Sequence, residues 1–506
     1  MRVLMDLHPA FSGYAGIQQE VRLLFKMLTQ ADNVKTSGLV LSPSWSTRAV
    51  PPRQSDPDKA AYYDRLSDFI AALDENLSKR VVHGPVARMR WVADVAIQAL
   101  SVMLKSAVGT SFPLFEIDSS LYADFLWQRL FSYSLSDADR ARIVGEKFLG
   151  TSLGRHFMHG VGMCGLPYPK LDSRGFDVVI AHAAFPCRLS KETQLIIRHQ
   201  DAIQFTHPDY NPNRRDFFIT YYLPLRYNVK RAKAIFVCNS EPTREDFVRL
   251  FPEAEARSFT IPCVISDSFY KVVNGDPIPE IVRRRSCPPY SASSVTASLD
   301  RSSNFAEDYL LVVARLEPRK NYLTVIKAWE QYRLKTGQDL KLIAVAGKGW
   351  EHHTLRQAME FHLARGNLFH LENVPVEELR ILYSRAKAVL SASYAEGFDI
   401  PGIEAMLCQC PVIASDIKTH RWVYGDAALY FDPDSATSLC DALEQLFHRD
   451  QAVRLRHELT RKGLELARGY QEDAVRPMWE DLLTKLENRK DGLRWGREAA
   501  QHTTGE

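Results

Sequence analysis

The 506-residue sequence lacks several features that would assign it quickly to a functional class. It has no marked excess of either charge, because 64 basic and 61 acidic residues nearly cancel, so composition gives no indication of nucleic-acid binding. Its eight cysteines include no C-x-x-C pair, which favours reduced thiols in the cytoplasm over a disulfide framework or a zinc site. No uncharged apolar run reaches the ~18 residues that span a bilayer. The amino-terminal residues 1–11 resemble a strand and not a signal peptide.

The length implies two to four domains at ~150 residues each, with a composition typical of a globular protein. Strand-like and helix-like patterns alternate in two regions, which predicts parallel sheets covered on both faces. The first region has strand patterns at 2–7, 36–42, 176–182, 194–200, 234–239 and 258–265. The second has strand patterns at 309–315, 340–346, 388–394 and 411–415, and helical patterns at 321–336, 354–365, 376–386, 401–408 and 435–447.

The segment EGFDIPGIEAM (396–406) is the most informative part of the sequence. It follows the strand-like run AVLSASY (388–394) and contains Pro401 where the first turn of a helix tolerates proline. The free N–H groups at that helix start would suit a diphosphate. Glu396 and Glu404 can each accept hydrogen bonds from the paired hydroxyls of a sugar or a ribose. The segment therefore predicts a site for a nucleotide sugar.

This pattern resembles the E-x7-E signature of the family 4 retaining glycosyltransferases, or group 1 glycosyltransferases, which have the GT-B fold. Other segments follow the family's order, and the resemblance covers most of residues 1–45 and 175–485. They are GYAGIQQEVRLL (13–24), IIRHQDAIQFTHP (196–208), AIFVCNSEPTREDF (234–247), YLLVVARLEPRKN (309–321), VAGKGW (345–350), VPVEELRILYSRA (374–386), CPVIAS (410–415) and YGDAALYFDP (424–433). The resemblance favours bacterial envelope polysaccharide enzymes that use GDP-mannose or a related donor, such as a UDP- or dTDP-sugar.

The resemblance implies an α/β protein in which two Rossmann-like domains face each other across a cleft. The expected acceptor-side domain covers residues 1–270, with an insertion at about 50–170. The expected nucleotide-sugar-binding domain covers 308–470, and the segment 271–307, rich in Pro and Ser, is expected to link the two. Residues 471–506 are expected to form a C-terminal helix and tail, and in the family the last helix commonly crosses back to the first domain.

The resemblance also implies roles for individual residues. Arg315 and Lys320 would be catalytic cations that stabilise the leaving diphosphate, and Glu396 would orient hydroxyls of the donor sugar. Glu404 would hold the ribose. The other expected donor-binding residues are Gly13, Gly16, His199, Asp201, Gly397, Phe398, Asp399 and Ile400. The glycines would form turns, at 13 and 16 in a loop that offers N–H groups to a phosphate, and at 397 after the strand.

The expected reaction moves a sugar from a nucleotide-diphosphate donor to a hydroxyl of a glycan or a lipid-linked acceptor, with retention at the anomeric carbon. No metal or other cofactor is expected, because the two cations would do the work of a metal. Asp432 and Asp434 form a D-x-D motif, but a helix cap at Asp434 or Ser435 is favoured over a metal site. The alternatives are a noncatalytic GT-B subunit that binds a sugar nucleotide or a partner enzyme, and another GT-B enzyme such as an epimerase or a phosphorylase.

Residues 78–109 are apolar and basic with helical spacing, and two interpretations stay open. The favoured one is a helix packed on the first domain, because Asp94 and Gln98 interrupt the apolar run. The other is a helix on an anionic membrane surface, where lipid-linked acceptors reside. The expected location is accordingly the cytoplasm, with the inner face of the plasma membrane as the peripheral alternative.

Three positions depart from the family's usual pattern. Gln200 stands where a histidine usually precedes the aspartate, although His199 is adjacent. Gln409 stands where a glycine is common, and Trp422 stands where many members carry a glutamate. These departures leave the donor-sugar contacts open.

Overall fold

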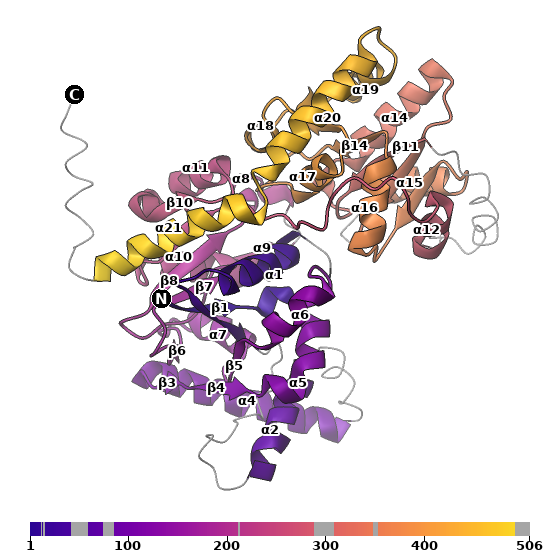
Figure 1. Cartoon of the computed structure of the whole chain (residues 1–506). Helices are drawn as coiled ribbons and strands as arrows, with labels where there is room; N and C mark the ends of the chain where they lie inside the picture. The colour runs from indigo at the N-terminus through magenta and orange to yellow at the C-terminus, as the bar shows by residue number, and fades with distance from the viewer. Residues whose placement is uncertain are drawn as a thin grey trace, which may run out of the picture.

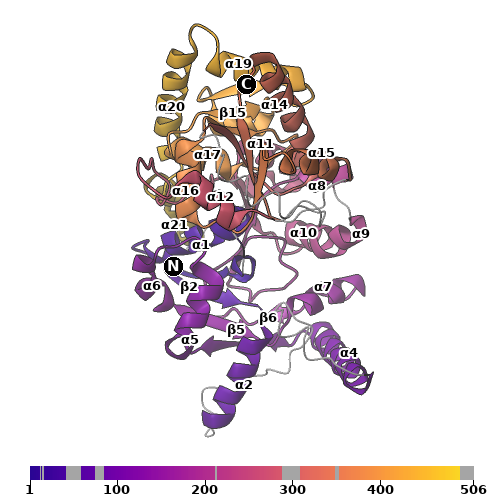
Figure 2. The same cartoon turned by 90° about the vertical axis from the view of Figure 1, so that its right-hand side faces the viewer.

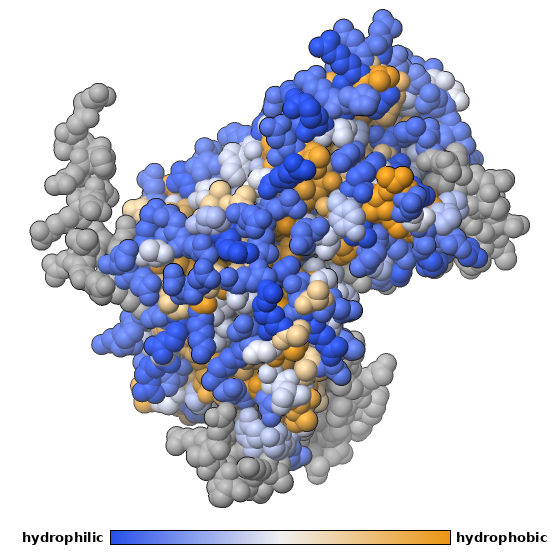
Figure 3. Space-filling model, viewed as in Figure 1, coloured by the Kyte–Doolittle hydropathy of each residue, from blue (hydrophilic) through white to orange (hydrophobic). Residues whose placement is uncertain are grey.

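The computed structural model describes residues 1–11, 13, 16–41, 59–73, 85–210, 213–287, 308–347 and 353–490. Within these residues the chain forms two α/β domains, each built on its own sheet (Figure 1). The visible face is mostly hydrophilic, and hydrophobic side chains gather near the junction of the two domains (Figure 3). The fold class predicted from the sequence is therefore confirmed in its main feature.

The first domain contains an eight-stranded sheet with the order β10-β9-β8-β7-β1-β2-β5-β4. All its strand pairs are parallel except β4 with β5. The strands are β1 (Arg2–Asp6), β2 (Lys35–Val40), β4 (Leu114–Ile117), β5 (Lys147–Thr151), β7 (Val178–Ala181), β8 (Gln194–His199), β9 (Ile235–Cys238) and β10 (Ser258–Thr260). A small separate sheet pairs β3 (Ser111–Phe112) with β6 (Lys170–Leu171).

Helices cover both faces of this sheet, and its central strands β7 and β9 are apolar and buried along their whole length, as parallel strands require. The α-helices are α1 (Gly16–Thr29), α2 (Lys59–Ala72), α4 (Pro85–Val108), α5 (Ser119–Leu126), α6 (Asp137–Val144), α7 (Arg155–Met163), α8 (Ile203–Thr206), α9 (Arg214–Phe217), α10 (Leu223–Lys230) and α11 (Glu241–Leu250). Shorter helical turns are η1 (His8–Ala10), η2 (Trp127–Phe131), η3 (Pro208–Tyr210), η4 (Phe218–Tyr222) and η5 (Pro252–Arg257).

The second domain contains a six-stranded, fully parallel sheet with the order β13-β12-β11-β14-β15-β16. Its strands are β11 (Tyr309–Val313), β12 (Lys341–Val345), β13 (Leu368–Leu371), β14 (Ala388–Ser391), β15 (Val412–Ser415) and β16 (Ala428–Phe431). Its helices are η8 (Pro318–Lys320), α14 (Tyr322–Thr336), α15 (His353–Leu363), α16 (Val376–Arg385), α17 (Ile400–Leu407), α18 (Lys418–Tyr424), α19 (Ala436–Phe447) and α20 (Ala452–Arg468).

The segment that the sequence assigns to a linker, 271–307, is partly folded. Residues Ile278–Arg285 form the helix α12, whose Ile278, Ile281 and Val282 are buried in the core of the second domain. These residues are therefore a folded part of the stretch expected to link the domains, because three apolar side chains at helical spacing give the short helix a face to bury. The rest of the predicted linker, from residue 288, lies outside the described residues.

The last helix, α21 (Glu472–Lys490), leaves the second domain and packs on the first. Figures 1 and 2 show it running from the end of α20 back across the first domain. Its buried Val475, Trp479 and Leu483 share one core with residues of α1 and β1. The last described helix thus packs on the domain in which the chain began, which ties the two domains together.

Every strand predicted from the sequence is present, although most are shorter than predicted. The strands that the sequence did not reveal lie mainly in the insertion, where β4 and β5 extend the first sheet, and at the second domain's edges, where β13 and β16 are four residues long. All eight cysteines are described, and none of them forms a disulfide bond. Among the described helices, none is sufficiently long and apolar to cross a membrane.

Candidate functional site

The strand order of the second sheet fixes where a ligand would bind. From β11 the chain adds β12 and β13 on one side, and then returns to add β14, β15 and β16 on the other. The carboxyl ends of β11 and β14 therefore lie side by side at a topological switch point, which is where open α/β sheets form their ligand crevice. Arg315 and Lys320 follow β11, and Glu396 follows β14.

Glu396 and Lys320 meet at this switch point. Lys320 donates a short hydrogen bond from Nζ to Oε1 of Glu396, and Arg319 donates from Nη1 to Oε2 at 2.9 Å. Ser393 donates its hydroxyl to Oε1 of Glu396 at 2.5 Å. The backbone supports the same geometry, because the N–H of Tyr394 donates to the carbonyl of Arg319 at 2.8 Å. The structure thus brings together two of the three predicted catalytic residues.

The electrostatics of this cluster keep Glu396 ionised. Burial alone would raise the pKa of its carboxyl, but the cations of Lys320 and Arg319 outweigh burial and hold the pKa well below its ordinary value. Arg319 is itself held by Glu317, whose Oε2 lies 3.1 Å from the guanidinium Nε. The charges of Lys320 and Arg319 are therefore balanced by two carboxylates before any ligand arrives.

Arg315, the third predicted catalytic residue, is placed differently. It is exposed, and it makes no ion pair with any residue in the part of the chain that the structure describes. Its position just after β11 puts it at the same sheet edge as Lys320. It therefore offers a cation that no carboxylate of the described residues neutralises.

Gly397 lies in a bend after β14, and the assembled structure adds a second requirement at this position, which is close approach of two backbones. A Cβ at this position would lie 2.0 Å from the carbonyl oxygen of Gln200 in the first domain. The carbonyl of Gly397 also accepts hydrogen bonds from Ser240 at 2.6 Å and from Thr243 at 3.2 Å. Gly397 is thus a point where the backbones of the two domains touch.

The left-handed residue of this segment is Asp399, with φ of 87°. Its carboxylate accepts from Tyr424 at 2.7 Å and from Ser391, and it lies 3.1 Å from Nε2 of His420. Burial would raise the pKa of Asp399, but the hydrogen bond to His420 and its charge bring the pKa below its ordinary value. These bonds hold a strained backbone at the start of α17. Ile400, the first residue of α17, is buried.

Glu404 and Phe398 are both buried, and they face protein groups. Glu404 accepts from the amide of Gln19 at 2.8 Å and from the hydroxyl of Tyr383 at 2.9 Å. Burial raises the pKa of Glu404 to about 7, although both hydrogen bonds oppose the rise. Phe398 packs edge-on against Tyr470, with ring centres 5.3 Å apart, and near Trp422.

Gly13 and Gly16 lie where the first domain meets the second. The backbone of Gly13 is left-handed, with φ of 87°, and its carbonyl accepts from Arg22 at 2.9 Å. Gly16 begins α1, and a Cβ there would lie 3.3 Å from Ile400 of the second domain. Both glycines therefore shape the edge of the first domain that faces α17.

His199 and Asp201 follow β8 at the carboxyl edge of the first sheet. His199 is buried against Tyr221, whose hydroxyl is 3.1 Å from Nδ1, and burial lowers the pKa of the ring to about 3. Burial raises the pKa of Asp201, and Arg319 of the second domain opposes this rise. Gln200, the departure between them, donates to Glu20 at 2.6 Å and so belongs to the buried Glu20–Arg198 pair of the first domain.

Two residues of this region were not singled out from the sequence. Arg319 holds Glu396, but a run of two cations in EPRK does not reveal which one points inward. His182 follows β7 directly, at the switch point between β1 and β7 in the first sheet. It is buried, and neither of its ring nitrogens has a hydrogen-bond partner among the described residues. Its place after an apolar strand was the signal that could have found it.

Gln409 and Trp422 are the other two positions that depart from the family's usual pattern. Gln409 adopts φ of 58° just after α17, a left-handed conformation that explains why a glycine is common at this position. Trp422 lies next to Phe398, with ring centres 6.3 Å apart. Asp434 is not a cap, since Ser435 accepts from the N–H of Ser438 at 3.1 Å and is the N-cap of α19.

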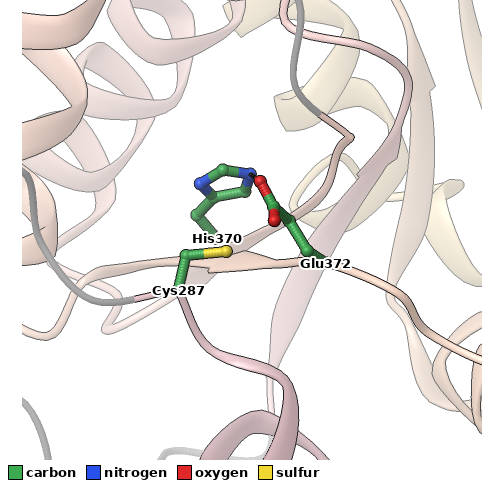
Figure 4. A group of neighbouring side chains, drawn as sticks. All are labelled: Cys287, His370 and Glu372. Carbon is green, nitrogen blue, oxygen red and sulfur yellow. Dashed lines mark ion pairs between the residues drawn. The ribbon is translucent and has the colours of Figure 1, made fainter. Parts of the chain in front are cut away.

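Cys287, His370 and Glu372 form a group of metal-ligand types away from this site (Figure 4). They lie where residue 286 pairs with the edge strand β13. Nε2 of His370 is 3.9 Å from the Glu372 carboxylate, but it is 2.9 Å from the carbonyl oxygen of Ala346. A carbonyl only accepts, so this nitrogen carries a hydrogen and has no lone pair for a metal. The group is therefore not assigned as a metal site.

A cavity of about 680 Å³ lies at the amino-terminal edge of the first sheet. Ligands of open parallel sheets bind outside the carboxyl ends of the strands, so this cavity is not the candidate site. Its lining includes Arg2, Lys35 and Lys147, each at the start of its strand.

Comparison with known proteins separates the second domain from the first. Residues 298–465, which contain the whole switch-point cluster of the second sheet, match the family model of glycosyl transferases group 1. The second domain belongs to this family. The group 1 domain holds Arg315, Lys320, Glu396 and Glu404, which are the residues that the family resemblance singled out.

Several similar proteins are named as mannosyltransferases. The chain is 27% identical over 284 residues to O-antigen chain mannosyltransferase B of Escherichia coli, covering 56% of this chain and 66% of that protein. It is 34% identical over 147 residues to O-antigen chain mannosyltransferase RfbU of Salmonella typhimurium, covering 29% of this chain and 40% of that protein. The chain thus spans just under two thirds of the first relative's length and less than half of the second's.

The solved structure of sucrose-phosphate synthase from Thermosynechococcus elongatus aligns with 96% of this chain and 99% of its own, with a TM-score of 0.55 and 15% identity. At this identity the likeness concerns the fold. It extends the GT-B architecture beyond the group 1 domain to both halves of the chain, as the sequence predicted.

Proposed function

We propose that the protein is a retaining glycosyltransferase that moves a sugar, mannose in the first instance, from a nucleotide-diphosphate donor to a hydroxyl of a glycan or a lipid-linked acceptor in polysaccharide biosynthesis. The observation that carries the proposal is the ionised Glu396 carboxylate held between Lys320 and Arg319 at the switch point of the group 1 domain. The names of two relatives state mannosyl transfer, which supports GDP-mannose as the first donor to test.

In the proposed reaction the bond between the anomeric carbon and the diphosphate oxygen breaks, and its electron pair stays on the diphosphate. Arg315 and Lys320 stabilise the growing negative charge, in place of a metal ion. Glu396 fixes Lys320 before the donor arrives, so little reorganisation is needed during the reaction. The acceptor hydroxyl attacks from the same face, and its proton passes to the departing phosphate oxygen. Glu404 and Gly397 support the nucleotide and the contact between the domains.

The test uses purified protein, GDP-, UDP- and dTDP-sugars, and a hydroxyl acceptor prepared from envelope glycan. Transfer is measured as acceptor-dependent release of the nucleoside diphosphate, with and without a chelator, and the product anomer is assigned by NMR. We expect turnover with one nucleotide class, retention of configuration, and no effect of the chelator. A noncatalytic subunit would bind a sugar nucleotide without turning it over.

Two lysine variants make this test specific to the site. Lys320→Met should lower kcat by about 100-fold to 1,000-fold while the donor Kd changes much less, because the lost charge acts mainly in the transition state. Lys327→Met removes an exposed lysine of α14 and is the matched control, for which we expect wild-type rates. Equal kcat for Lys320→Met and the wild type would remove Lys320 from the mechanism.

A further inference from the structure

The outer face of α4 is apolar, contrary to the usual pattern of a surface helix. Its described exposed side chains are Met89, Val92, Ala93, Ala96, Ile97, Leu100, Ser101, Leu104, Lys105, Ala107 and Val108. Nine of these eleven are apolar and none is acidic. Six are large, with exposed fractions between 53% and 81%. Globular proteins scatter exposed apolar residues singly, whereas this set is contiguous along one helix.

The opposite face of α4 already has its partner. Val102 and Ser106 are buried, and Val95, Ala99 and Met103 pack against the core on that face of the first sheet. These positions alternate at helical spacing with the exposed apolar ones, so one stripe faces the domain and a second faces outward. Packing on the first domain therefore explains the inner stripe, as the favoured interpretation of the sequence expected, and leaves the outer stripe unexplained.

Charge indicates what the outer face contacts. Residues 78–109 contain five basic residues and one acidic residue, a local excess of four in a chain whose net charge is only +3. An exposed apolar helix face in a stretch of sequence with an excess of Lys and Arg fits the interface of an anionic bilayer. A second copy of the chain fits less well, because a twofold interface would set this basic segment against itself.

We propose that α4 docks the protein on an anionic membrane surface, with the exposed face of Met89, Ile97, Leu100, Leu104 and Val108 inserted at the headgroup level. Figure 2 shows α4 at the end of the first domain that lies away from the second, so the second domain would lie away from the bilayer. The helix lies on the membrane and does not span it. The proposal deepens the proposed function, since a docked enzyme would meet lipid-linked acceptors.

The experiment is flotation of the full chain with vesicles, without any sugar. One set of vesicles is phosphatidylcholine, and the other contains about one quarter phosphatidylglycerol. The test variant is Leu100→Glu with Leu104→Glu, and the matched control is Leu334→Glu, which changes an 86% exposed leucine of α14 in the other domain. Ile97→Glu, at a 67% exposed residue of the same face, is an independent second variant.

We expect the wild type and Leu334→Glu to float with the anionic vesicles, and both α4 variants to lose at least about tenfold in bound fraction, with unchanged thermal midpoints. Equal flotation of the wild type and the α4 variants, or no flotation of the wild type, would overturn the proposal. A wild-type dimer that the α4 variants convert to a monomer in light scattering would also overturn it, in favour of a second copy. Because no donor is present, the result is independent of whether the enzyme transfers sugar.

Discussion

Glu404 is a buried carboxyl whose ionisation lowers the stability of the folded protein. Its carboxyl is buried, and its two hydrogen bonds do not compensate fully, so its pKa rises from 4.5 to about 7. The folded state therefore holds this proton to a higher pH than the unfolded chain does. The contribution of Glu404 to stability is fully present below about pH 4.5 and is lost as the pH rises through about 7.

We therefore predict that Glu404→Gln stabilises the donor-free protein at about pH 8 by on the order of 3 kcal/mol and has little effect at about pH 5. The amide stays neutral and can still accept from Gln19. The measurement is urea unfolding at both pH values. Glu465→Gln, at an exposed glutamate of α20, is the control and should keep the wild-type pH dependence. Parallel pH profiles for Glu404→Gln and the wild type would contradict the prediction.

Some side-chain contacts of the site could be predicted from the sequence, and others could not. Glu396 and Lys320 could be placed together because each follows an apolar strand, and adjacent parallel strands end at the same sheet edge. The hydrogen bond between Gln19 and Glu404 could not be predicted, since it joins residues 385 positions apart across two domains. The requirement for glycine at 397 could not be predicted either, because the close approach of this residue to Gln200 exists only once the two domains are assembled.

At the scale of elements, the pattern of apolar runs predicted six of the eight strands of the first sheet and four of the six strands of the second. Strands such as β11 and β14 are continuous apolar runs, as buried parallel strands must be. The insertion did not reveal β4 and β5, because short strands with mixed polarity give no clear period. The helix α12 was obscured by its Pro- and Arg-rich sequence, although its three buried apolar side chains decide its structure.

The helix α21 is the element that holds the chain's end on the first domain. Trp479 is 1% exposed, and its ring lies 5.9 Å from the guanidinium of Arg198, which pairs with Glu20 at 2.5 Å. A residue late in the sequence thus covers an ion pair in the core of the first domain. This arrangement predicts that truncating the chain before α21 exposes that core.

We predict that Trp479→Ala destabilises the first domain by about 3–5 kcal/mol, because it leaves a large cavity beside a buried ion pair. Met478→Ala is the matched control, since Met478 is 44% exposed on the same helix, and it should change stability by less than about 0.5 kcal/mol. Chemical unfolding of the full chain followed by near-UV circular dichroism gives both values. Similar losses for the two variants would mean that α21 contributes little through Trp479.

At the scale of the whole molecule, the two carboxyl edges of the sheets face each other through a few polar bonds. Gln19 meets Glu404, and Ser240 and Thr243 both donate to the carbonyl of Gly397. Such bonds bring the candidate site of the second domain against residues that follow β8 and β9 of the first. Weakening one of these bonds should therefore favour a molecule in which the two domains lie further apart.

Ser240→Ala tests this link. Loss of its buried bond to Gly397 should cost about 1–3 kcal/mol of closure, enough to shift the balance between closed and open forms by about fivefold or more. We expect a larger radius of gyration in solution scattering without donor, and a raised donor KM. Ser240 also caps α11, so the control is Ser435→Ala, which removes the corresponding cap of α19 and no contact between domains. A similar radius of gyration for both variants would show that capping, and not closure, is what Ser240 provides.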